Sequence, residues 1–157
     1  MDILNIIESL KLEYLSLPDN EWRKDYFNED NGGYLVTSRK RINEALVKRE
    51  PEKLTIEHNM CLTFARNGFR IRHYEDEKSK GSFDVTINGI RADLKRTKST
   101  NNIIRYAKHA FRVQKAEIIL VEFEQWGNDF RNIVSEMTRK GIHGYYFVKG
   151  NEVIHSF

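Results

Sequence analysis

The segment from Phe83 to Arg96, FDVTINGIRADLKR, constrains the fold most because it predicts a β-hairpin of defined register. Its centre, Asn88-Gly89, is the strongest short signal for a two-residue type I′ turn, in which both central residues need positive φ. Side chains alternate between the two faces of such a hairpin, so Asp84 is expected directly opposite Asp93. One face is then wholly apolar, and the other carries Asp84, Thr86, Arg91, Asp93 and Lys95.

The two opposed carboxylates predict a metal site. Cross-strand partners have Cβ atoms roughly 5 Å apart, and like charges at that spacing destabilise the pair. A divalent cation between Asp84 and Asp93 would relieve the repulsion, and Mg²⁺ prefers one or two carboxylates together with phosphate oxygens. Lys95 would then orient an attacking water or steady the charge that develops on a phosphate. The alternative is a solvated strand face on which Lys95 makes an ordinary salt bridge.

Length and composition indicate a polar globular chain with a real core. The chain has 157 residues, of which 39% are hydrophobic and 31% charged. No apolar run approaches the ~20 residues of a membrane helix, and the N-terminus lacks the layout of a signal peptide. The lone Cys61 forbids an internal disulfide and favours a reducing compartment. We expect one main domain over residues 34–157, preceded by a helix and a polar connector over residues 1–33.

The net charge of +3 is unevenly distributed along the chain. Between Arg91 and Lys115 there are eight Lys or Arg and one acid, Asp93, which gives this segment +7 and the remainder −4. Such a patch suits an anionic substrate drawn to a metal. A stripe at helical spacing within it, Arg105, Lys108, Arg112 and Lys115, is either a solvated helix face or a contact surface for backbone phosphates.

Apolar periodicity predicts an α/β sandwich with a mixed central sheet and a right-handed parallel crossover. Residues 19–33 are expected to be polar and turn-rich, and residues 38–50 fit a helix or an exposed connection equally well. Ser99, Thr100 or Asn101 is the expected N-cap of the basic helix. Helices are expected over residues 2–17 and 51–67. The basic helix is expected to run from this cap to about residue 115, and a further helix is expected to end before Gly141. Strands are expected over residues 34–37, 69–75 and 117–123, and a terminal hairpin over residues 144–149 and 152–155.

Glu57 is a further candidate because it falls inside the apolar stripe of its own helix. A carboxylate in a core-facing stripe is costly unless it is paired or bound to a metal. The alternative is a Glu at the edge of the stripe, with its carboxylate in solvent. Gln114 falls on the buried edge of the basic helix, where it either touches the site or satisfies a hydrogen bond in the core.

These segments, in this order, resemble the PD-(D/E)XK nuclease superfamily, and more closely the tRNA-cleaving C-terminal toxin domains of contact-dependent growth inhibition systems. The resemblance covers about residues 32–147. Phe83 stands where the superfamily has proline, and Asp93 where Glu is frequent. The matching segments are Gly32-Gly33-Tyr34-Leu35-Val36, Glu57 with Phe64-Ala65-Arg66-Asn67-Gly68-Phe69, Ser82-Phe83-Asp84 with Asn88-Gly89, Ala92-Asp93-Leu94-Lys95-Arg96, Asn101-Asn102-Ile103 with Tyr106-Ala107-Lys108, and Lys140-Gly141-Ile142-His143-Gly144-Tyr145-Tyr146.

The resemblance implies a restriction-endonuclease-like α-β-β-β-α-β core with an extra N-terminal helix and a C-terminal hairpin. It also implies hydrolysis of phosphodiester bonds with Mg²⁺ or Mn²⁺. Glu57, Asp84 and Asp93 would hold the metal, and together with Lys95 they would form the catalytic set. Substrate contacts would come from Arg96, Lys98, Asn102, Arg105, Lys108, Arg112 and Gln114.

The resemblance to toxin domains favours tRNA as the substrate and implies an immunity protein as a partner. It also implies action in the cytoplasm after delivery as part of a larger secreted effector. Two alternatives stay open. One is a DNA endonuclease of restriction, repair or junction-resolving type, and the other is a nucleic-acid-binding module without catalysis. The sequence does not predict the oligomeric state, and no membrane partner is expected.

Overall fold

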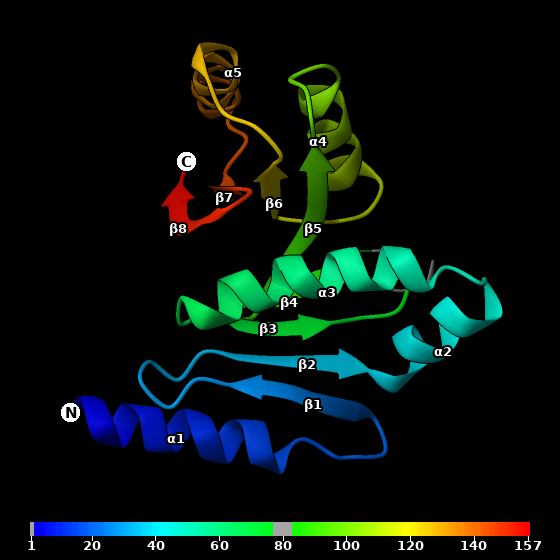
Figure 1. Cartoon of the computed structure of the whole chain (residues 1–157), viewed down its shortest axis with the longest axis vertical. Coiled ribbons are helices and arrows are strands. Elements are labelled where there is room, and N and C mark those ends of the chain that lie inside the picture. The colour runs from blue at the N-terminus through cyan, green and yellow to red at the C-terminus, as the bar shows by residue number, and fades with distance from the viewer. Residues whose placement is uncertain (1, 77–82) are drawn as a thin grey trace. The chain divides into compact units, whose positions relative to one another are not determined.

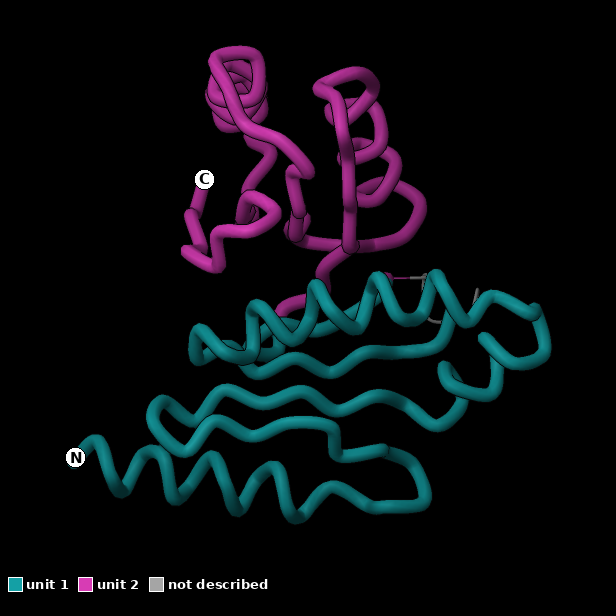
Figure 2. The backbone as a smooth tube through the Cα atoms, in the orientation of Figure 1, with its two compact units in different colours: residues 1–76, 84–89 teal, residues 77–83, 90–157 magenta. Residues whose placement is uncertain are grey.

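The computed structural model describes residues 2–76 and 83–157. The chain divides into two compact units, one of residues 1–76 and 84–89 and the other of residues 77–83 and 90–157 (Figure 2). Each unit contains a mixed sheet and helices, so the predicted α/β class is confirmed (Figure 1). Within the described part of the chain, no helix has the length and apolar character needed to cross a membrane.

The order of elements along the chain contains the predicted α-β-β-β-α-β run, which begins at α3 and ends at β6. The first unit consists of α1 (Ile3–Ser16), β1 (Trp22–Phe27), β2 (Tyr34–Ser38), α2 (Arg39–Val47), α3 (Pro51–Arg66), β3 (Arg70–His73) and β4 (Val85–Ile87). The second consists of β5 (Ile90–Thr97), α4 (Ile103–Arg112), β6 (Ile118–Phe123), α5 (Asn128–Arg139), β7 (Gly144–Val148) and β8 (Asn151–Ser156).

The sheet of the first unit is built around β2, which is buried along its whole length. β1 runs antiparallel to β2, β2 parallel to β3, and β3 antiparallel to β4. On one face of β2, Tyr34 and Val36 pack with Tyr14 of α1. On the other face, Thr37 hydrogen-bonds to Asp25, and α3 lies against the strand. Helices on both faces explain why this short strand has no exposed side.

The second unit packs its two helices on one face of β6. β5, β6 and β7 are parallel, and β8 returns antiparallel to β7. Ile119, Val121 and Phe123 of β6 form a core with the apolar stripes of α4 and α5. The parallel pairing of β5 with β6 across α4 and the terminal hairpin are both confirmed.

The predicted turn at Asn88-Gly89 is confirmed, since φ is 50° at Asn88 and 85° at Gly89. The limits of α3 are also confirmed. Pro51 occupies its first turn, where no backbone N–H is required, and Gly68 follows its end with a φ of 92°. Local turn and capping chemistry therefore predicted these boundaries correctly.

The predicted start and end of the basic helix were wrong. α4 begins after Asn102, which has a φ of 64°, and ends at Arg112 instead of continuing to residue 115. The expected cap residues serve another purpose. Thr97 and Ser99 exchange hydrogen bonds, and the Ser99 hydroxyl accepts from the Asn101 N–H, so these groups close a turn before the helix.

The sequence missed β1 and left α2 undecided. β1, WRKDYF, has charged residues at its centre and a bulge between Lys24 and Tyr26, so it lacks a period-two pattern. Its charges are paired, Arg23 with Asp25 and Lys24 with Asp19. The segment expected to be a polar connector therefore contributes a strand to the sheet of the first unit.

Gly144 provides a test of the packing between β6 and β7. A Cβ at Gly144 would lie 1.8 Å from the carbonyl oxygen of Ile119, a backbone atom that cannot move aside. We expect Gly144→Ala to lower the free energy of unfolding by about 1–3 kcal/mol or more. The matched control is Gly127→Ser, because a Cβ at Gly127 meets nothing within 4 Å. Urea unfolding followed by circular dichroism measures both, and equal stabilities would contradict the predicted clash.

Candidate active site

The predicted site residues fall in both units. Glu57 and Asp84 belong to the first unit, while Asp93, Lys95 and all the predicted substrate contacts belong to the second. The cross-strand opposition of Asp84 to Asp93 stays a prediction.

Asp93 and Lys95 lie on the same face of β5, as strand alternation predicts. The Lys95 Nζ is 2.8 Å from Oδ2 of Asp93. The Asp93 side chain is 1% exposed and that of Lys95 is 25% exposed. The pair is therefore not the solvated strand face of the alternative interpretation. A buried carboxylate is held beside a cation that still reaches solvent.

The Asp93 carboxylate has a cationic partner at its buried oxygen. Its Oδ2 lies 2.8 Å from the Lys95 ammonium, which offsets its negative charge. Burying a carboxylate is costly, and an ion pair offsets part of that cost. An ionised carboxylate has about four lone-pair positions, so Asp93 can accept a further ligand such as a metal ion.

Tyr106 connects Lys95 to the basic helix α4. The Lys95 Nζ lies 5.7 Å from the centroid of the Tyr106 ring, and the Arg105 guanidinium carbon lies 5.3 Å from it. Both distances are within the range of cation–π attraction. The ring therefore holds two cations on one side of the unit, next to the buried Asp93.

The outer face of α4 is a basic surface, as predicted. Arg105, Lys108 and Arg112 are exposed, and within the described chain none of them forms an ion pair with a carboxylate. Unpaired cations at one-turn spacing are the arrangement that contacts a phosphate backbone. A hollow in the surface follows this face and is lined by Ile104, Arg105, Tyr106, Lys108, His109 and Arg112.

Arg96 differs from the other predicted substrate contacts. Its guanidinium lies 2.8 Å from Glu122 and 2.7 Å from Glu124, so two carboxylates already occupy it. Burial and the neighbouring Glu124 raise the pKa of Glu122, against the opposing effect of Arg96. A phosphate contact at Arg96 would have to replace these ion pairs.

The remaining predicted contacts differ in exposure. Lys98 is exposed and lines a second hollow together with Lys149. Asn102 is exposed immediately before α4 and makes no side-chain capping bond. Gln114 follows α4, and its buried Oε1 has no hydrogen-bond partner among the described residues. The alternative in which Gln114 satisfies a hydrogen bond in the core therefore does not apply to this oxygen.

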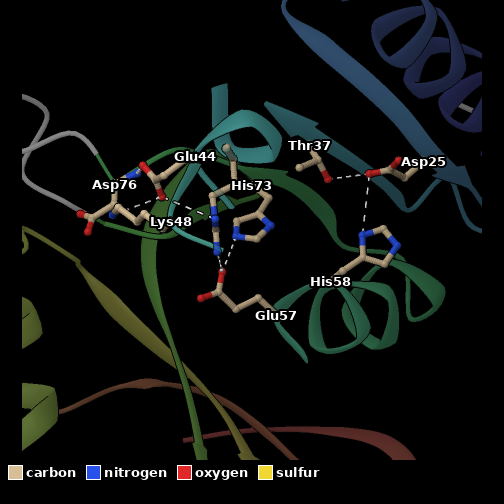
Figure 3. A network of polar contacts seen from close by, with 9 residues as sticks. Asp25, Thr37, Glu44, Lys48, Glu57, His58, His73 and Asp76 are labelled. Atoms are coloured by element: carbon tan, nitrogen blue, oxygen red, sulfur yellow. Dashed lines mark hydrogen bonds and ion pairs between the residues drawn. The ribbon is translucent and has the colours of Figure 1, made fainter. Parts of the chain in front are cut away.

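Glu57 lies in a network of ion pairs within the first unit (Figure 3). Its Oε2 is 2.8 Å from His73 Nε2 and 3.1 Å from Arg41 Nη2. Arg41 also pairs with Glu44 at 3.5 Å, and Glu44 accepts a hydrogen bond from the Asp76 N–H. Pairing to His73 and Arg41 therefore explains how a carboxylate sits in the apolar stripe of α3.

The environment of Glu57 favours its ionised form. Burial acts to raise its pKa, but the hydrogen bond from His73 and the charges of His73 and Arg41 lower it below the usual value. The Cys61 thiol, one turn further along α3, shows the opposite effect. Burial, and then the negative charges of Glu57 and Asp84, raise the pKa of Cys61 well above its usual value. Cys61 is therefore a neutral core residue, and both carboxylates act on the same part of α3.

A second cluster in Figure 3 lies beside this network. The Thr37 hydroxyl donates to Oδ2 of Asp25 at 2.5 Å, and His58 Nδ1 is 3.8 Å from the same oxygen. Burial lowers the pKa of His58 more than Asp25 raises it. A neutral His58 is consistent with the long separation, which is outside hydrogen-bond range.

Across residues 2–76 and 83–157, no three His, Cys, Asp or Glu side chains form a ready-made metal cluster. Metal binding at Glu57, Asp84 and Asp93 thus stays a prediction. Within its own unit, Asp93 offers carboxylate oxygens of the kind that a hard cation prefers.

Comparison with known proteins gives a fold relationship. No protein-family model matches the chain, and no curated protein matches it. Among solved structures, a CdiA-CT/CdiI toxin and immunity complex from Burkholderia pseudomallei matches with a TM-score of 0.52 and 20% sequence identity. The match covers 66% of this chain and 83% of that chain. At this identity the comparison shows a shared fold.

Sequence reasoning missed three residues that organise the site: Arg41, His73 and Tyr106. Arg41 and His73 contact Glu57 from α2 and β3, and no local pattern brings these segments together. Tyr106 had a visible signal, because it is an aromatic residue inside a basic helix that contains no acid.

The Glu57 network predicts a stability difference between two cations on α2. The Arg41 side chain is 5% exposed, whereas that of Lys48, which lies 3.9 Å from Glu44, is 49% exposed. We expect Arg41→Met to lower the free energy of unfolding by about 3 kcal/mol, because Glu57 and Glu44 lose a buried partner. Lys48→Met, the matched control, should change it by less than about 0.5 kcal/mol. Similar midpoints of urea unfolding would contradict a structural role for the network.

Proposed function

We propose that this chain is a divalent-metal-dependent nuclease of the PD-(D/E)XK type that cleaves tRNA. The observation that carries the proposal is the Asp93–Lys95 pair. It places a buried carboxylate 2.8 Å from a partly exposed lysine, immediately before an exposed basic helix. A carboxylate that can hold a metal ion and a lysine that can offset charge on a phosphate are the groups that metal-dependent phosphodiester hydrolysis uses.

Each residue then has a role in phosphodiester hydrolysis. Asp93, with Asp84 and Glu57, would hold Mg²⁺ or Mn²⁺ through carboxylate oxygens. When bound, the ion would polarise the scissile phosphate and lower the pKa of a water molecule. The Lys95 ammonium would offset negative charge that develops on the phosphate. Arg105, Lys108 and Arg112 would position the neighbouring backbone, with Lys98, Asn102 and Gln114 as further contacts.

The toxin part of the proposal is supported by the fold. The solved neighbour is a toxin bound to an immunity protein, and it shares the fold of this chain. We propose that this chain likewise acts as a toxin domain of a contact-dependent growth inhibition system, delivered by a larger secreted effector to the cytoplasm and neutralised by an immunity protein.

Cleavage of total tRNA tests the nuclease directly. We expect discrete cutting by the wild type with Mg²⁺ or Mn²⁺, and none with EDTA. Asp93→Asn should reduce the rate at least about 100-fold, because several kcal/mol of transition-state stabilisation depend on the metal. Lys95→Gln should also reduce it. Duplex DNA in parallel reactions distinguishes the tRNA nuclease from the alternative DNA endonuclease.

The matched control for Asp93→Asn is Asp129→Asn, an exposed acid in the first turn of α5 of the same unit. Lys140→Gln, an exposed lysine in that unit, serves as control for Lys95→Gln. Both controls should cut at the wild-type rate. Metal-independent cutting, or full activity of Asp93→Asn, would reject the proposed site, and folded wild type that cuts neither substrate would reject the proposed enzyme.

Metal should also change thermal stability, which is a test independent of cleavage. At a hundredfold excess over its dissociation constant, a bound ion stabilises the native state by about 2.7 kcal/mol, or about 5–10 °C in melting temperature. We expect this rise with Mg²⁺ or Mn²⁺ in the wild type and its loss in Asp93→Asn. An equal rise in both proteins would place the metal elsewhere.

A further inference from the structure

We propose that Tyr106 is a stacking platform for an unpaired base of the nucleic-acid substrate, and this inference rests on the proposed function. Tyr106 is on α4, and 45% of it is exposed. A large aromatic side chain is usually covered when a helix has an apolar stripe to hide it. The stripe of α4 is complete without Tyr106, since Ile103, Ala107 and Ala110 are fully buried.

Basic side chains predominate around Tyr106. Lys95 and Arg105 lie over its ring at 5.7 Å and 5.3 Å from the centroid. Lys108, His109 and Arg112 line the same hollow, together with Ile104. An exposed aromatic ring in a groove of basic side chains is the composition of surfaces that bind single-stranded nucleic acid, where the cations follow the backbone and the ring stacks on a base.

Another exposed aromatic residue of this unit shows why Tyr106 is distinctive. Trp126 is 37% exposed, but its ring is already stacked on Tyr146, with centroids 5.2 Å apart and planes 13° apart. Within the described residues, no aromatic side chain stacks on Tyr106, and the partners over its ring are the cations of Lys95 and Arg105. The ring face of Trp126 is taken by another aromatic ring, whereas Tyr106 has two long cationic side chains over its ring and no stacked ring.

The position of Tyr106 also limits the substrate. A base inside a duplex presents its π-face only to its neighbours in the stack, so Tyr106 can take a base only from an unpaired segment, an end or a distorted pair. The ring contacts Lys95, so the stacked base would lie beside the proposed catalytic lysine. The substrate is therefore expected to present an unpaired nucleotide next to the scissile phosphate.

Binding in EDTA tests this inference without cleavage. The probe is a fluorescein-labelled 12-nucleotide single-stranded RNA, alone or annealed to its complement, titrated with full-length wild type and variants. Tyr106→Leu should weaken single-strand binding roughly five- to hundredfold, which is the loss of one stacked base. Tyr106→Phe and Tyr106→Trp, which keep the ring, should retain it. Duplex binding should be unchanged in all three variants.

Salt dependence separates stacking from phosphate contact. Arg112→Gln should weaken single-strand and duplex binding alike and reduce the slope of log K against log salt by about 0.7–0.9, the value for one phosphate contact. Tyr106→Leu should leave that slope unchanged. Arg139→Gln is the matched control, because Arg139 is also an exposed arginine in the last turn of a helix of this unit, and it should change neither binding nor slope.

The outcomes distinguish this inference from the nuclease. Loss of single-strand binding in Tyr106→Leu with rescue by Phe supports the platform even if the wild type cleaves no nucleic acid. Unchanged single-strand binding in Tyr106→Leu overturns the platform even if the wild type is a metal-dependent nuclease. Absence of single-strand binding in the wild type, or equal losses for single strand and duplex, also overturns it.

Discussion

The alternation of side chains along β5 determines most of what is distinctive in the second unit. Ala92 and Leu94 point to one face and are buried, so Asp93 and Lys95 must share the other. The Asp93 side chain is itself buried, while that of Lys95 stays partly exposed. The period-two pattern thus places a lysine beside a carboxylate, and the burial of Asp93 makes theirs an ion pair between a buried anion and a partly exposed cation.

Glu57 and Asp93 are two largely buried carboxylates, and different partners offset their negative charge. Glu57 is compensated by two donors, Arg41 and His73, which lower its pKa and keep it ionised. Asp93 has an ion pair with Lys95 at Oδ2. Glu57 therefore meets two cationic side chains at one oxygen, whereas Asp93 meets a single lysine that also reaches solvent.

The two faces of the basic helix carry different residues, one face for packing and the other for charge. The inner stripe of α4 builds the core with β6, and this leaves Arg105, Lys108 and Arg112 outside without acidic partners. Arg96, although it belongs to the same basic segment, is neutralised by Glu122 and Glu124. Charge counted along the sequence therefore overstates the cations available to a substrate, and the fold selects which of them remain free.

The sequence by itself determined what local chemistry controls. It predicted the Asn88-Gly89 turn, the limits of α3, the order α-β-β-β-α-β, and the common face of Asp93 and Lys95, because each depends on φ preferences or on a period of a few residues. It missed β1, whose charged centre and bulge hide the strand period, and it misplaced the start of α4, where Thr97 and Ser99 form a turn. Only the tertiary structure decided that Arg41 and His73 hold Glu57, that Glu122 and Glu124 occupy Arg96, and that Tyr106 meets Lys95. These contacts join residues from separate elements, and no pattern within one element encodes which distant side chain will fill the space beside it.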